Sequence, residues 1–213
     1  MPKKNIKQFA SYKKGLIQVK LNQLINCHAI DKIFLSTNDI EILDYASSLN
    51  CKKIIKHKRS EILSSNDCST DSLIGHALDL IKSGHIMWTH VTSPFVNSKK
   101  YDLIIKKYHE VINNGYDSLM TINLLRGFLW DSKGPINYKR GVEKWPRTQT
   151  IESIFEVNSA VFIANAELYK KNNDRIGRKP YLYELGKIEG FDIDWNDDFE
   201  IAQQITKSGI IDL

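Results

Sequence analysis

The alternation of helix-length amphipathic segments with short β-branched runs constrains the fold of this chain more than any other feature. Residues 31–36 (DKIFLS) and 85–91 have the composition of strands, whereas 11–27 and 98–114 carry apolar residues at helical spacing. Strands that alternate with helices are typical of βαβ units, in which helices cover a parallel sheet. The pattern therefore predicts an α/β fold with a doubly wound, mostly parallel sheet.

The remaining segments continue this pattern except in one region. Further strands are predicted at 52–56, 117–122 and 155–163, and further helices at 38–49, 69–81, 165–171 and 197–208. Between residues 123 and 156 the chain consists of short pieces rich in Gly, Pro, Asn and aromatic residues. We expect a β-rich insertion or extended arm there, on a single domain formed by residues 1–213.

Length and charge narrow the class of protein. The chain of 213 residues suits one domain, and its 30 Lys and Arg residues, against 25 Asp and Glu, are spread along the sequence. This spread argues against a nucleic-acid surface. No apolar run approaches the ~20 residues of a membrane span, and the first residues lack the apolar core of a secretion signal. Three cysteines without CxxC spacing fit a reducing compartment. We expect a cytoplasmic protein with no membrane or nucleic-acid partner.

Two carboxylates near the C-terminus are the first candidate site. Asp192 and Asp194 flank Ile193, and in an extended segment alternate side chains point to the same side. Two such carboxylates repel each other unless a cation lies between them, and oxygen ligands suit Mg²⁺ bridged to phosphates. The alternative is that they cap the helix that begins near Asp197. For Asp197 and Asp198 themselves, capping is the favoured interpretation.

Two further places lie where predicted strands end, which is where open α/β sheets bind ligands. Arg59 leaves a strand, and Ser69 and Thr70 begin a helix whose N-terminus could hold an anion. Thr92 and Ser93 turn sharply before Pro94, and their hydroxyl groups could hold a sugar or a phosphate. Ordinary capping and a plain turn are the competing interpretations.

Arginine is scarce, with 6 Arg against 24 Lys, which favours placement where a planar donor is needed. Arg147 and Gln149 lie in the predicted arm, and Arg175 and Arg178 follow the short helix at 165–171. These side chains could bind a carboxylate through two hydrogen bonds. Basic surface loops without a ligand are the alternative.

Taken in order, these segments resemble the acylneuraminate cytidylyltransferases, the CMP-sialic acid synthetase family. The resemblance covers almost the whole chain, and the set is more specific than any one motif. Its motifs are Lys4-Asn5-Ile6, Ser36–Ile42 (STNDIEI), Arg59-Ser60-Glu61 with Leu63 and Ser69-Thr70, Thr92-Ser93-Pro94, Phe128-Leu-Trp130, Asn137-Tyr138, Pro146–Gln149, and Asp192-Ile193-Asp194 with Asp198-Phe199.

The resemblance implies a Rossmann-like fold and transfer of CMP from CTP to a nine-carbon acidic sugar. It implies that Asp192 and Asp194 hold Mg²⁺ and that Lys4 lies near the phosphates, so that these three residues are catalytic. It also implies homodimers joined through the arm. The resemblance further implies two sets of binding residues. The nucleotide would be bound by Asn5, Arg59, Cys68 and Thr70, and the sugar by Thr92, Ser93, Arg147, Gln149, Arg175 and Arg178.

The chain also departs from the family pattern. Family members place an apolar strand, and a loop with Arg, Ser and Lys, before the segment that matches Lys4-Asn5. That strand would lie between 31–36 and 86–91, so we expect a gap in the sheet: either the two strands move together or an upstream segment exists. Phe95-Val96 also replaces the usual Leu-Arg.

Two other functions remain open from the sequence. One is a truncated relative that only binds nucleotide or dimerises. The other is a glycosyltransferase in which Asp192-Ile193-Asp194 forms a DxD motif, although such motifs usually lie mid-chain.

Overall fold

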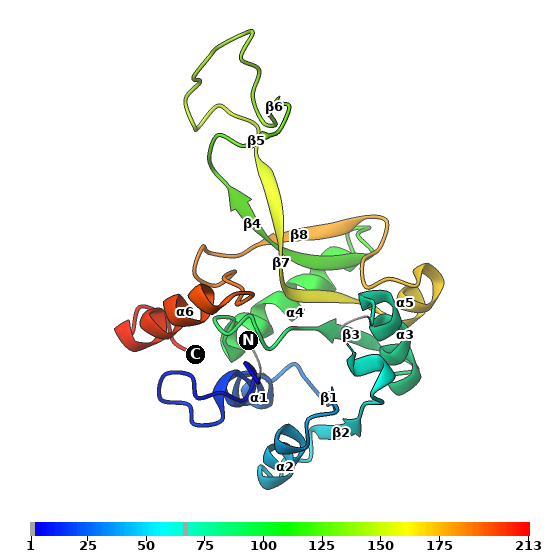
Figure 1. Cartoon of the computed structure of the whole chain (residues 1–213). Helices are drawn as coiled ribbons and strands as arrows, with labels where there is room; N and C mark the ends of the chain where they lie inside the picture. The colour runs from blue at the N-terminus through cyan, green and yellow to red at the C-terminus, as the bar shows by residue number, and fades with distance from the viewer. Residues whose placement is uncertain (1–2, 66–67) are drawn as a thin grey trace.

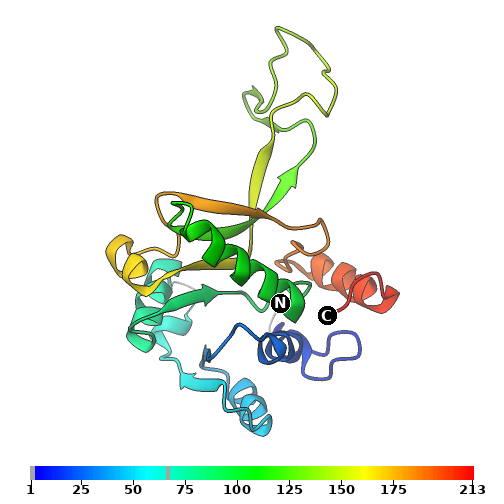
Figure 2. The ribbon, with the colours of Figure 1, turned by 180° about the vertical axis from the view of Figure 1, so that it is seen from behind.

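The structure, a computed structural model, describes residues 3–65 and 68–213 as an α/β body with one long projection (Figures 1 and 2). In chain order the elements are α1 (Gly15–Asn26), β1 (Ile33–Thr37), α2 (Ile40–Ser48), β2 (Ile54–Lys58), a 3-10 turn (Ile62–Ser64), α3 (Thr70–Leu80), β3 (His85–Trp88), α4 (Ser98–Ile112), β4 (Ser118–Leu125), β5 (Trp130–Asp131), β6 (Gly134–Pro135), β7 (Ile154–Asn165), α5 (Ala166–Asn172), β8 (Pro180–Glu184) and α6 (Asn196–Ser208).

The main sheet has the order β3-β7-β4-β8. β4 and β8 are parallel, whereas β7 runs antiparallel to both of its neighbours, with Ile163 opposite Leu119 of β4 and Met87 of β3. β1 and β2 form a separate parallel pair. The predicted α/β fold is confirmed. The alternation of helices and strands did not indicate that β7 runs in the opposite direction to its neighbours.

Helices cover both faces of the main sheet. α1 and α4 pack on one face through residues such as Leu21, Ile104 and Tyr108, in a core that includes Ile163 of β7. The next residue of β7, Ala164, faces the opposite core beneath α3 and α5. Figure 2 shows α4 in front of the sheet, and Figure 1 shows α3 and α5 on the other side. This two-sided burial follows from the period-2 alternation of a strand.

The expected gap lies between β1 and β3. Within the described ranges β1 pairs only with β2, and β3 pairs only with β7. The sequence allowed two outcomes: either these two strands move together, or an upstream segment exists. The first is not observed, because β1 and β3 do not pair with each other.

Some element boundaries differ from the prediction. α1 begins at Gly15 and not near residue 11, because residues 3–14 fold back onto it and a Cβ at Gly15 would collide with the carbonyl oxygen of Lys7. Gly15 also has a φ of 66°, which favours glycine. β8 was not predicted; it begins with Pro180 at the edge of the sheet, a position that tolerates proline.

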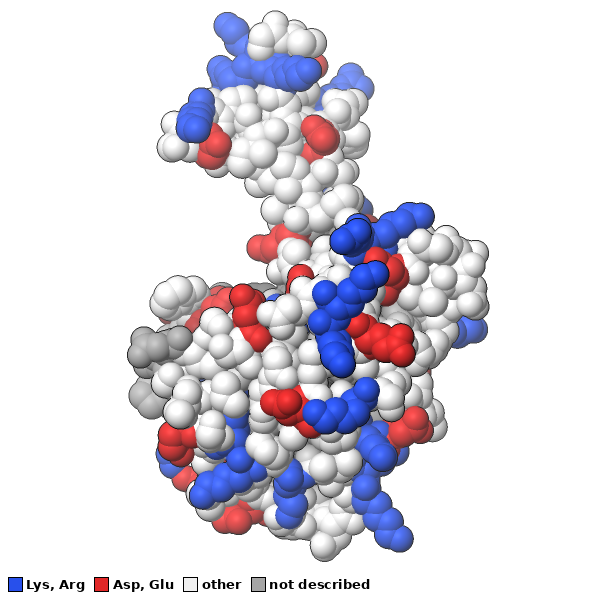
Figure 3. All heavy atoms as spheres, turned by 90° about the vertical axis from the view of Figure 1, so that its right-hand side faces the viewer, with Lys and Arg blue, Asp and Glu red and all other residues white. Residues whose placement is uncertain are grey.

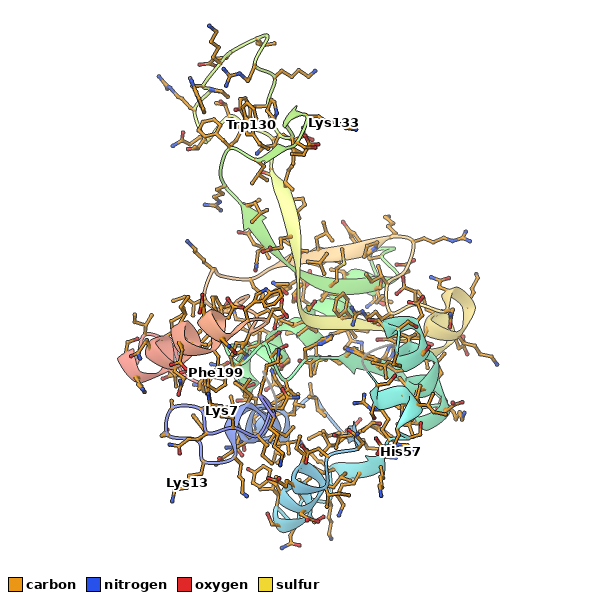
Figure 4. All side chains as sticks on the ribbon, in the orientation of Figure 1. Lys7, Lys13, His57, Trp130, Lys133 and Phe199 are labelled. Atoms are coloured by element: carbon orange, nitrogen blue, oxygen red, sulfur yellow. The ribbon has the colours of Figure 1, made fainter. Side chains whose placement is uncertain are left out.

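The arm is a continuation of β4 and β7. Asn123 pairs with Glu156 and Leu125 with Ile154, and beyond them residues 126–153 project from the body (Figure 1). Strands in this outer part are limited to the two-residue β5 and β6, so the arm is less β-rich than expected. Trp130 and Lys133 lie in it, far from Phe199 of α6 (Figure 4).

The surface mixes both signs of charge. On the face drawn in Figure 3, Lys and Arg side chains lie among Asp and Glu over the body, and further cationic side chains gather at the far end of the arm. None of the helices in the described ranges combines the length and the apolar character that a bilayer crossing requires.

Candidate functional site

The segment around Asp192 and Asp194 is anchored by the residue between them. Ile193 is fully buried with Phe9 and Phe199, whereas Asp192 is half-buried and Asp194 is exposed. The amide of Ile193 donates to the carbonyl oxygen of Thr92 at 3.0 Å. Burial of the middle residue thus holds the Asp192 carboxylate beside the turn that follows β3, and Asp194 is the next residue but one along the chain.

Lys4 lies at this segment. Its ammonium donates to the carbonyl oxygen of Ile193 at 2.7 Å, between the two aspartates in the sequence. The neighbouring Asn5 accepts from the amide of Ile17 through its backbone, which ties residues 3–7 to α1. Lys7 lies 5.0 Å from the ring centre of Phe199, so the same stretch also packs on α6 (Figure 4). The structure therefore brings together Lys4, Asn5, Asp192 and Asp194.

The Thr92–Pro94 turn connects the aspartates to α1. Ser93 is fully buried, and its hydroxyl donates to Oδ1 of Asp192 at 3.4 Å. From α1, Lys20 donates to the carbonyl oxygen of Ser93 at 2.8 Å and Gln23 to that of Pro94 at 2.6 Å. Complete burial lowers the pKa of Lys20 to about 7, although the nearby Asp192 charge opposes this shift.

Arg175 is the second cationic group near the end of β3. Its guanidinium lies 3.8 Å from the ring centre of Phe162, and Nη1 lies 3.1 Å from Nε2 of His90. Nε1 of Trp88 donates to the same histidine nitrogen at 3.1 Å. Burial, together with the Arg175 charge, lowers the pKa of His90 to about 4, with Asp192 opposing this shift. At neutral pH His90 is thus an uncharged acceptor for Arg175 and Trp88.

The other predicted nucleotide residues lie elsewhere. Arg59 follows β2, its backbone amide donates to Thr37, and its Nε donates to Ser64 at 3.1 Å. Ser69 caps α3 by accepting from the amide of Ser72, as the capping interpretation expects, and Thr70 is exposed in the first turn. Cys68 is half-buried just before this cap. No hydrogen bond or ion pair within the described ranges joins Arg59, Cys68 or Thr70 to Lys4 or Asp192.

The remaining predicted sugar ligands are dispersed. Arg147 and Gln149 are exposed in the arm, which projects from the body (Figure 1). The side chain of Arg178 is also exposed, and its backbone amide donates to the carboxylate of Asp117 at 2.7 Å. Thr92 is half-buried and contributes its carbonyl oxygen to Ile193. Of the four predicted Arg and Gln ligands, the structure places only Arg175 beside the end of β3.

Asp192 and Asp194 would form only part of a ligand set for the expected cation. The described residues contain no cluster of three His, Cys, Asp or Glu side chains that could hold a metal ion. Asp198 instead accepts from the amides of Asp194 and Trp195, as expected for a cap. Two carboxylates without a third protein ligand match Mg²⁺, which keeps several waters and is completed by phosphate oxygens.

Lys20 and His90 were not identified from the sequence. Lys20 follows Leu16 by four residues, so helical spacing places it on the same buried face as Leu16 and Leu24. A lysine on the apolar face of a predicted helix is the signal that could have identified Lys20. His90 carries no comparable signal, because its partner Arg175 is 85 residues away.

Two surface hollows lie outside this region. One, of about 310 Å³, lies between α2 and β2, and the other, of about 360 Å³, between α5 and Asp117. Neither is lined by Asp192 or Asp194, and Arg178 is the one predicted ligand that lines either of them.

Solved structures with similar folds include a synthetase and a synthase. A CMP:2-keto-3-deoxy-manno-octonic acid synthetase complexed with CTP has 9% sequence identity, a TM-score of 0.64 and coverage of 99% of this chain and 94% of the other. A 4-diphosphocytidyl-2C-methyl-D-erythritol synthase has 10% identity, a TM-score of 0.64 and coverage of 95% and 94%. At these identities the likeness shows the fold, which is the Rossmann-like α/β type.

Curated relatives show closer sequence similarity. A pseudaminic acid cytidylyltransferase of Campylobacter jejuni is 27% identical over 119 residues, which are 54% of this chain and 48% of the relative. An N-acylneuraminate cytidylyltransferase of Streptococcus agalactiae is 24% identical over 210 residues, which are 93% of this chain and 48% of the relative. The chain thus spans about half the length of these relatives. A family model described as cytidylyltransferase matches residues 1–205, and the chain belongs to this cytidylyltransferase family.

Proposed function

We propose that this protein transfers CMP from CTP to an acidic sugar of the sialic-acid type, such as sialic, legionaminic or pseudaminic acid, and releases pyrophosphate. Membership of the cytidylyltransferase family supports the nucleotide part of this proposal. The names of the Campylobacter and Streptococcus relatives support the class of acceptor.

The observation that carries the proposal is the contact between Lys4 and the aspartate segment. Its ammonium binds the carbonyl oxygen of Ile193, while Asp192 and Asp194 flank that residue. One cation next to two carboxylates suits a triphosphate, whose oxygens need both a cationic side chain and a bridging metal ion.

In the proposed reaction a sugar hydroxyl attacks the α-phosphorus of CTP. A new P–O bond forms, the bond from the α-phosphorus to the bridging oxygen breaks, and pyrophosphate leaves with that electron pair. Lys4 would neutralise phosphate charge, and Asp192 and Asp194 would hold Mg²⁺, which would polarise the α-phosphate and favour loss of the hydroxyl proton to solvent. Ser93 would keep Asp192 oriented through its hydroxyl. Most of the catalysis is then positioning and charge neutralisation.

We propose that the acidic group of the acceptor binds near Arg175. Its guanidinium has no ion pair within the described ranges and is fixed by Phe162 and His90, so a planar carboxylate could bind to it without moving it. We also propose homodimers joined through the arm, which exposes Val142, Trp145 and Ile136. In such a dimer Arg147 and Gln149 would reach the partner's sugar site.

The test is pyrophosphate release from the purified protein with Mg²⁺. We expect release with CTP and an acidic nine-carbon sugar, and little with ATP, GTP or UTP or with neutral hexoses. Silence across a panel of sialic, legionaminic and pseudaminic acids would contradict the proposed acceptor. Sugar transfer from a nucleotide-sugar donor, with CTP inert, would favour the DxD glycosyltransferase.

A second candidate is a relative that binds CTP without turning it over. The interrupted ladder between β1 and β3 favours it, because a site beside an open sheet edge is held less firmly. Calorimetric binding of CTP without pyrophosphate release would support this alternative, and turnover would exclude it.

A further inference from the structure

Lys20 is the most deeply buried charged group described for this chain. Its side chain is 2% exposed, and it lies within α1, where the surrounding residues are mainly apolar. A lysine ammonium has three N–H donors, and two of them are accounted for by the Ser93 carbonyl oxygen at 2.8 Å and the Tyr101 hydroxyl at 2.5 Å. None of the ion pairs formed within the described ranges includes Lys20. A cation buried without a carboxylate partner is costly to keep, and so calls for an explanation.

The neighbours of Lys20 connect it to the candidate site. Ser93, whose carbonyl oxygen accepts from Lys20, donates its own hydroxyl to Asp192. The Asp192 charge acts on Lys20, and the Lys20 charge acts on His90. The uncompensated charge therefore lies directly behind the turn that holds Asp192, where bound phosphates would add negative charge.

Gln23 shows that holding the turn does not require a charge. It lies three residues further along α1, is 3% exposed, and donates to the next carbonyl oxygen of the same turn, that of Pro94, at 2.6 Å. A neutral amide thus makes the same kind of contact one residue away. The ammonium of Lys20 supplies something that Gln23 does not, which is a positive potential.

We propose that Lys20 is a positioning residue that supplies the counter-charge of the site: its ammonium fixes the Thr92–Pro94 turn, opposes binding of a bare cation at Asp192, and favours binding of a polyanion beside it. This inference rests on the proposed function for the identity of the polyanion, which is the triphosphate of CTP. Lys20 does not touch the ligand, because the turn lies between them.

Removing the charge should move two affinities in opposite directions. In Lys20→Gln and Lys20→Met, binding of Mn²⁺ alone should become roughly tenfold tighter, and binding of metal-free CTP roughly tenfold weaker, as expected for one buried charge at moderate distance. Calorimetry at about pH 6, where the wild-type ammonium is charged, measures both. The glutamine variant retains a donor for the turn and the methionine variant does not, so equal shifts in the two identify the charge as the cause.

Gln23→Met is the matched control, because it removes a neutral donor from the same turn. A loosened turn should move both affinities in the same direction in this variant. Both Lys20 variants should fold, since each removes a buried charge, and circular dichroism checks this.

Three results would overturn the inference: parallel losses of both affinities in the Lys20 variants, no change in either affinity, or no binding of Mn²⁺ to any of the proteins. A wild-type protein that binds Mn²⁺ but not CTP would instead refute the proposed function, and the Mn²⁺ comparison would still decide the role of Lys20.

Discussion

Replacement of Lys20 should change the stability of this protein with a sign that depends on pH. Burial lowers the pKa of Lys20 from 10.5 to about 7 in the folded protein. At roughly 1.4 kcal/mol per pKa unit, this difference corresponds to about 5 kcal/mol. Between about pH 7 and 10.5 the unfolded chain binds a proton at Lys20 that the folded protein does not, so wild-type stability rises with pH across this window. Below about pH 7 the full cost of the buried charge is present.

Lys20→Met removes this cost and also removes the donor to the Ser93 carbonyl oxygen and to the Tyr101 hydroxyl, which keeps its hydrogen bond with Thr89. Loss of these contacts costs about 1–3 kcal/mol at every pH. Near pH 6 we therefore expect Lys20→Met to be about 2–4 kcal/mol more stable than the wild type, and near pH 10.5 about 1–3 kcal/mol less stable.

Urea unfolding of both proteins at several pH values measures this difference. Other titrating groups cancel in the comparison, except His90, whose pKa the Lys20 charge lowers. A Lys20→Met protein that is less stable by the same amount at every pH would refute the reasoning, because Lys20 would then titrate alike in both states.

Three further predictions follow from named contacts. Arg175→Gln should raise the KM of the acidic sugar about tenfold and leave CTP binding unchanged, because it removes the cation, stacked on Phe162, that we propose binds the carboxylate of the acceptor; an equal loss of CTP affinity in steady-state and binding measurements would contradict this. Ser93→Ala should raise the Mg²⁺ concentration for half-maximal rate by less than about fivefold, since the 3.4 Å contact to Asp192 is long, and a larger effect would make Ser93 a direct ligand. In the arm, Val142→Asp should convert the proposed dimer to monomers in sedimentation experiments, because Val142 is 85% exposed. The control Ile62→Asp changes a residue that is 83% exposed outside the arm, and it should leave the dimer intact. A dimer that survives Val142→Asp would place the interface elsewhere.

Local features of this fold could be predicted from the sequence. The helical spacing of apolar residues gave α4 and α6 within a few residues of their observed bounds, because 3.6-residue periodicity follows directly from a helix with one buried face. The alternation around Ile193 also gave a buried middle residue, which lies between a half-buried Asp192 and an exposed Asp194. Asp198 as a cap was also foreseen, since it depends on contacts within four residues.

Long-range features could not be predicted in this way. The direction of β7 depends on its pairing with β3 and β4, which periodicity within β7 does not encode. β8 is short and begins with Pro180, so it lacks a run of strand-forming residues. The contact of Arg175 with His90 joins positions 85 residues apart, and only the folded chain brings them together. Lys20 was not predicted because most lysines lie on the surface. Its burial follows only when its place on the buried face of α1 is considered.

Pyrophosphate release from CTP by Asp192→Asn and Asp194→Asn variants tests the central claim most directly. Each substitution keeps the shape of the side chain and removes one carboxylate charge next to the Lys4 contact. The account predicts that each variant folds normally and loses at least about a hundredfold in Mg²⁺-dependent rate with an acidic sugar as acceptor. Rates equal to that of the wild type would contradict it.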